Sequence, residues 1–183
     1  MNRDLATPAI LWPRIALSLL VVAVAGTAQL APSAAAAGPA LAFRGAEGPG
    51  ATALGGRGGR ILRVTTLADS GPGSLRAAVE ATGPRLIVFD IGGTIRLASP
   101  LTVRHGRLTI AGQTAPGGGI TLRDHPLVIA ADDVVIRYLR SRLGDESGVE
   151  ADAVSIERGR RIILDHISAS WSIDETLSAG SRY

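Results

Sequence analysis

Short runs of aliphatic and β-branched residues, separated by Gly, Pro and Asp, recur along most of the chain. After Gly83 and Pro84 they span residues 86–91, 94–98, 101–103, 108–111, 120–122, 127–130, 134–138, 152–156 and 162–167. Short runs of this kind between turn-forming residues predict β-strands. Another run covers residues 61–66. We therefore expect an all-β protein.

One segment has a helical pattern instead. Ser74 is a suitable N-cap, and Leu75, Ala78 and Val79 form one apolar stripe within residues 75–81. We expect a single short helix over residues 74–81.

The expected strands repeat at intervals typical of stacked units. Runs that begin at Leu86, Leu108, Val134 and Ile162 are separated by 22, 26 and 28 residues. Periods of about 20–50 residues indicate solenoids or propellers, and several strands per period with little helix favour a parallel β-helix. A β-sandwich would be expected to use tight hairpin turns such as Asn-Gly, which the sequence lacks. The helix, placed before the first coil, is expected to cap the open end of the core.

The segment from residue 43 to residue 60 contains seven glycines. Such a segment predicts a loop with unusual backbone angles. It is not typical of a phosphate-binding loop, because no Gly-Lys-Ser/Thr sequence follows.

The N-terminal residues have the pattern of a secretory signal peptide. Arg3 and Arg14 precede an apolar run at residues 15–25, and small residues lead to Ala37. We expect cleavage near Ala37, so that residues 1–37 are removed and residues 38–183 form one extracellular domain with no membrane attachment. An N-terminal membrane anchor is the alternative.

Composition narrows the sources of stability and the kinds of partner. The chain has no cysteine, so packing, hydrogen bonds or a metal must replace disulfides. All 19 basic residues are arginine, the net charge is +3, and aromatic residues make up only 3%. This composition disfavours a nucleic-acid partner and is compatible with an anionic polymer.

Three acidic residues are candidates for a calcium site. Glu150 and Asp152 are two apart in an expected strand, so their carboxylates would share one face. Asp174 follows Asp152 by 22 residues, one coil by the shortest period, and would lie about 4.8 Å above it. Calcium binds oxygen ligands at about 2.3–2.6 Å and could bridge such a pair. Ordinary solvated acids or ion pairs with nearby arginines are the alternative, and zinc is disfavoured because the three histidines are scattered.

Residues 166–174 alternate strictly between polar and apolar side chains. This pattern predicts a half-buried strand, unless a corner between coils interrupts the alternation.

Several motifs, taken in order, resemble those of bacterial pectate lyases of polysaccharide lyase family 1, in the pectin lyase-like superfamily. They cover most of residues 42–182 and comprise Ala42–Gly48, Gly71–Arg76, Ala111–Gly117, Ile136–Arg140, Asp152–Ala153, Leu164–Ser168 and Ser170–Glu175. The resemblance implies a right-handed parallel β-helix that uses Ca²⁺ to cleave polygalacturonate by β-elimination.

The resemblance also implies roles for individual residues. Calcium ligands carry over onto Asp152 and Asp174, and Glu150 stands where the family often has an acidic ligand. Asp165 and His166 match an Asp-His pair that supports the site from behind. The family's catalytic base is an arginine in a motif downstream of this region, so we expect the base beyond Tyr183 and regard the chain as the N-terminal portion of an incomplete, monomeric lyase domain.

Two other functions remain open. A polygalacturonase-like glycoside hydrolase would use Asp152 and Asp174 as its acid and base. A non-catalytic secreted β-helix would use calcium only to hold its coils together while it binds glycans.

Overall fold

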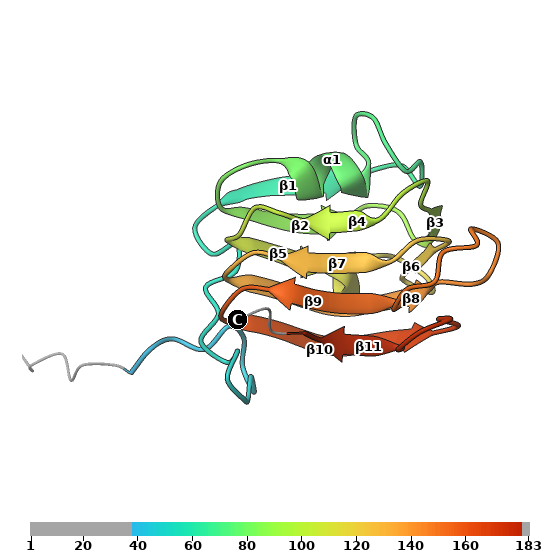
Figure 1. The fold of residues 1–183 in the computed structure, drawn as a ribbon. Helices are drawn as coiled ribbons and strands as arrows, with labels where there is room; N and C mark the ends of the chain where they lie inside the picture. The colour runs from blue at the N-terminus through green and yellow to red at the C-terminus, as the bar shows by residue number, and fades with distance from the viewer. Residues whose placement is uncertain (1–37, 181–183) are drawn as a thin grey trace, which may run out of the picture. The chain divides into compact units, whose positions relative to one another are not determined.

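The computed structural model describes residues 38–180, and these form a stack of parallel β-coils (Figure 1). The predicted parallel β-helix is thereby confirmed. The elements are β1 (Arg60–Val64), α1 (Leu75–Glu80), β2 (Arg85–Phe89), β3 (Gly93–Arg96), β4 (Leu101–Val103), β5 (Leu108–Ala111), the 3₁₀-helix η1 (Gly112–Thr114), β6 (Ile120–Arg123), β7 (Leu127–Ala130), β8 (Val134–Arg142), β9 (Val154–Arg158), β10 (Ile162–Ser170) and β11 (Leu177–Ala179).

The strands form two parallel sheets. The larger has the order β1-β2-β5-β8-β6-β3, with β10 also paired to β8, and the smaller has the order β11-β9-β7-β4. β8 pairs with β5 through its first half and with β6 through its second half. The larger sheet therefore covers two sides of each coil, and β8 and β10 each turn the corner between those sides.

Tyr138 and His166 form that corner. Both have φ of 55°, and their rings stack with centroids 4.2 Å apart and planes 16° from parallel. Positive φ is uncommon for residues other than glycine, and here the stacked rings help to hold it. The strict alternation predicted from residue 166 is therefore interrupted at this corner, and again at Trp171, whose φ is 61°.

The register differs slightly from the predicted one. Arg85 pairs with Leu108, so Leu86 lies opposite Thr109 and the first step is 23 residues rather than 22. The next two steps, 26 and 28, are as predicted. Three consecutive apolar residues in β2 allow either alignment, and only the pairing decides between them.

Three element predictions need correction. β1 is a rung of the larger sheet, paired with β2, so the helix lies after the first strand of the stack rather than before it. β9 begins at Val154, which leaves Asp152 in the preceding turn. β11 was not expected from the sequence.

α1 packs its apolar stripe onto the coil core. Leu75, Ala78 and Val79 are buried in the same cluster as the inward residues of the strands. Ser74 begins the helix, because its side chain accepts a hydrogen bond from the backbone N–H of Ala77 at 3.1 Å. The helix thus covers the core next to β1 (Figure 1), as expected of a cap.

Arg85 is a fully buried cation at the end of this helix. Burial lowers the pKa of its guanidinium, and no carboxylate of the described residues pairs with it. Instead it donates to five backbone carbonyls, those of Ala78, Val79, Gly83, His105 and Gly106. The guanidinium therefore joins the last turn of α1 to the next coil.

The glycine-rich segment is a loop, as predicted, and it lies against the backbone of several coils. A Cβ on Gly56 would be 1.9 Å from the carbonyl oxygen of Arg85, and one on Gly50 would be 2.0 Å from that of Ile162. The backbone N–H of Leu54 donates to Asp133 Oδ1 at 3.0 Å. Glycine is therefore required here mainly for close approach.

Two sequence predictions fall outside the description of the fold. The predicted signal peptide, residues 1–37, lies outside the described residues. Within residues 38–180, no helix is both long and apolar enough to cross a membrane.

Candidate metal centre

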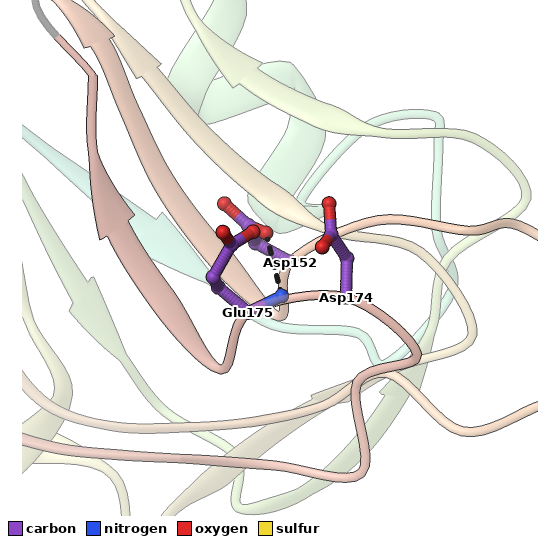
Figure 2. Close-up of side chains that lie close together, drawn as sticks. All are labelled: Asp152, Asp174 and Glu175. Atoms are coloured by element: carbon purple, nitrogen blue, oxygen red, sulfur yellow. Dashed lines mark hydrogen bonds between the residues drawn. The ribbon is translucent and has the colours of Figure 1, made fainter.

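Three carboxylates converge where successive coils stack. Asp152, Asp174 and Glu175 each offer an oxygen, and these oxygens all lie within 4.8 Å of one another (Figure 2). The stacking explains their meeting. β11 pairs with β9 so that Leu177 lies opposite Val154, and Glu175 and Asp152 each stand two residues before those partners.

Asp152 is held in place by the next coil. Its Oδ1 accepts a hydrogen bond from the backbone N–H of Glu175 at 3.1 Å, and its Oδ2 accepts one from the hydroxyl of Ser178. Asp152 is half-buried, whereas Asp174 and Glu175 are exposed. The group therefore combines one fixed carboxylate with two that solvent can reach.

The three acids have no cationic side chain to balance them. None of the ion pairs formed by the described residues includes any of the three. Asp152, and after it Asp174, raises the pKa of the Glu175 carboxyl above its ordinary value, because each disfavours a further negative charge. A bound cation would relieve this repulsion.

The spacing suits calcium. Two oxygens bound to one Ca²⁺ at about 2.3–2.6 Å can be at most about 5.2 Å apart. The separations of up to 4.8 Å in this group satisfy that limit. Three carboxylates leave part of a six- to eight-fold shell for water or a ligand, and the exposure of two of them leaves that side accessible. The residues present therefore fit a calcium ion.

The structure brings together two of the three predicted ligands and adds one. Asp152 and Asp174 belong to the group, as their one-coil separation suggested, but Glu150 does not. Glu175 was missed because the coil step between β9 and β11 is 23 residues, so Glu175 rather than Asp174 stands one coil beyond Asp152. Aligning residues 154–156 with residues 177–179 would have revealed it.

Asp165 and His166 lie on β10, in the other sheet. Asp165 Oδ2 accepts a hydrogen bond from Arg137 Nε at 2.6 Å, and Asp165 Oδ1 lies 2.8 Å from His166 Nδ1. Burial opposes ionisation of Asp165, yet these two partners together lower its pKa. No hydrogen bond among residues 38–180 links the pair to the three acids. Their contacts hold the corner where His166 stacks on Tyr138.

The comparisons with known proteins agree with this architecture. No protein-family model matches the chain. Probable pectate lyase C of Aspergillus fumigatus is 50% identical over 139 residues, which cover 75% of this chain and 33% of the relative. Probable pectate lyase C of Aspergillus oryzae is 47% identical over the same shares. Probable pectate lyase P56 of Solanum lycopersicum is 34% identical over 155 residues, covering 73% of this chain and 38% of the relative.

A solved structure supports the fold. The crystal structure of Jun a 1, the major allergen from cedar pollen, matches with a TM-score of 0.59 and 27% identity, over 72% of this chain and 44% of that chain. The sequence and fold matches together class the chain with the polysaccharide lyases. Within that class the relatives are pectate lyases.

Two qualifications follow from the same matches. The relatives are fungal and plant proteins, so the expected bacterial subset of the family is not supported. The chain spans about a third of the length of the curated relatives it matches.

Proposed function

We propose that this chain is the calcium-binding portion of a secreted pectate lyase that cleaves polygalacturonate by β-elimination. One observation carries the proposal: a chain related to pectate lyases stacks three carboxylates within 4.8 Å of one another on neighbouring coils. Bound calcium would neutralise a uronate carboxylate of the substrate and so make its C5 proton more acidic.

The chain's own residues orient the site and leave room for substrate. Asp152 keeps its aim because the backbone of Glu175 and the hydroxyl of Ser178 both donate to it. Asp174 and Glu175 present their oxygens to solvent, on the side from which a polymer would approach. We assign the step that removes the C5 proton to an arginine beyond Tyr183, following the resemblance. A positioned base contributes typically about 10²–10⁴-fold.

The two other functions receive less support. An inverting hydrolase separates its carboxyl groups by about 6.5–9.5 Å to admit a water, whereas these oxygens lie within 4.8 Å. The sequence relatives described above are pectate lyases, which favours neither a hydrolase nor a non-catalytic glycan binder.

We further propose export through cleavage near Ala37 and an extracellular, monomeric domain without membrane attachment. The support is the apolar run at residues 15–25 followed by small residues. N-terminal sequencing of the secreted protein should begin within a few residues of Gly38. A cell-bound protein that still begins at Met1 would contradict this proposal.

Elimination is tested with polygalacturonate, with and without calcium, by following the ultraviolet absorbance of the unsaturated product. We expect chelator-sensitive activity from a protein extended to the length of the relatives, loss of that activity on Asp174→Asn, and negligible activity from the 183-residue chain. Saturated product ends formed without calcium would instead indicate a hydrolase. Binding without cleavage by the extended protein would indicate a non-catalytic protein.

A further inference from the structure

The outer face of β3, β6 and β8 carries two rows of polar side chains. Register places these residues side by side on adjacent strands: Thr94, Thr121 and Arg140 in one row, and Arg96, Arg123 and Arg142 in the other. The residues between the rows point inward and are buried: Ile95, Leu122 and Ser141. Alternation along each strand thus turns both rows to the outside.

A hollow of about 730 Å³ lies over these rows. The strands form its floor, and its walls come from residues 144–146 and 171–173. A second hollow of about 420 Å³, walled by residues 92–93 and 116–119, shares Thr94, Thr121 and Arg140 with the first. The two hollows form one groove along the strands, which we call the arginine groove and define by Thr94, Thr121, Arg123, Arg140, Arg142 and Trp171.

Two arginines of the groove keep an unbalanced positive charge. Arg140 donates to Thr121 Oγ1 at 2.9 Å and to the carbonyl of Gly118, and Arg142 donates to Ser168 Oγ at 2.8 Å and to backbone carbonyls. These acceptors are all neutral, and neither arginine forms an ion pair within the described part of the chain. Two residues apart on one strand, the Cα atoms of these residues are separated by roughly 6.6 Å along the groove.

The acidic wall of the groove is partly neutralised. Arg123 donates to Asp124 and also pairs with Glu146, which leaves Asp145 as the lining carboxylate that forms no ion pair among residues 38–180. An anionic chain would therefore lie on the side of Thr121 and Arg140, away from that wall.

Trp171 stands at the rim with 71% of its surface exposed. Its φ of 61° is rare for so large a side chain, and the turn after β10 holds it there. An exposed indole beside unpaired guanidinium groups offers both an apolar face and anion-binding donors, the combination found in binding sites for amphipathic ligands.

We propose that the arginine groove binds a stretch of acidic polysaccharide at a site separate from the three acids. Arg140 and Arg142 hold carboxylates of the polymer through charge-assisted hydrogen bonds, and Trp171 packs against a sugar ring. The identity of the polymer rests on the proposed function. The groove would keep the enzyme on its substrate independently of calcium.

The test is titration calorimetry of the full 183-residue chain with tetragalacturonate in the presence of EDTA, so that no calcium can link the ligand to the three acids. We expect measurable binding that weakens with salt. Trp171→Ala and Arg140→Gln should each weaken it at least about tenfold, because each removes a principal contact. Arg44→Gln, an exposed arginine outside the groove, is the matched control and should bind as wild type.

Other ligands and variants separate this inference from the calcium proposal. A neutral galactose tetramer should bind at least about tenfold more weakly than tetragalacturonate, because it offers no carboxylates. Asp174→Asn should retain the binding seen in EDTA even where calcium affinity falls. Failure of wild type to bind in EDTA, or wild-type affinity of Trp171→Ala, would overturn the arginine groove and leave the calcium site untouched. Trp171 is largely exposed, so its replacement should leave the fold intact.

Discussion

Asp152 Oδ1 accepts a hydrogen bond from the backbone N–H of Glu175 at 3.1 Å, and this bond crosses from one coil to the next. The same contact brings the side chain of Glu175 beside a carboxylate that repels it. The peptide group therefore stabilises an arrangement that the two charges oppose. A site built in this way depends on both coils and on a cation to complete it.

Replacing Arg85 with lysine should lower the stability of the fold markedly. An ammonium has three donors, so at least two of the five carbonyls that Arg85 now binds would lose their partner inside the core. We expect a loss of about 2–5 kcal/mol in the free energy of unfolding. Urea unfolding measures it, with the exposed Arg60→Lys as the control. Equal stabilities of the two variants would show that Arg85 does not join α1 to the coils.

A side chain at Gly56 should force the glycine-rich segment away from the coils. The added Cβ would overlap the backbone of Arg85, which cannot yield as a flexible side chain would. We expect Gly56→Ala to cost about 1–3 kcal/mol or more, measured by thermal unfolding. Gly118 is the matched control, because it has open space around it and no positive φ, so Gly118→Ala should be neutral or slightly stabilising. A neutral Gly56→Ala would contradict the close approach.

Asp133 should make stability depend on pH in the acid range. Its carboxylate is buried and accepts two hydrogen bonds from Arg161, both at 2.7 Å, which lower the pKa of Asp133. The ionised form therefore stabilises the fold at pH values above the ordinary aspartate pKa of about 3.9, and this contribution is lost as the pH falls through the lower folded-state value.

Asp133→Asn should cost about 1–3 kcal/mol at neutral pH, and its difference from wild type should shrink below about pH 4. Urea unfolding at several pH values measures both effects. Asp90→Asn is the control, because Asp90 pairs with Arg63 at the exposed surface and should have a much smaller effect. A wild-type advantage over Asp133→Asn that is the same at pH 7 and pH 3 would rule out ionisation of Asp133 as its source.

The sequence predicted the β-helix because the spacing of apolar runs depends on local composition. Its errors arose where pairing decides the outcome. β11 is short and has one exposed leucine, so only its pairing with β9 defines it. Glu175 became a candidate only when that pairing set the coil step. No local pattern marks Arg85 as buried, because its partners come from α1 and from two separate turns.

Calcium titration of two matched variants tests the central claim most directly. Glu175→Gln removes a carboxylate from the group, whereas Glu150→Gln removes one that lies two residues from Asp152 and outside the group. Isothermal calorimetry should show calcium binding to the wild-type chain, at least about tenfold weaker binding to Glu175→Gln, and nearly unchanged binding to Glu150→Gln. Unchanged affinity in Glu175→Gln, or no calcium binding by the wild type, would contradict the account.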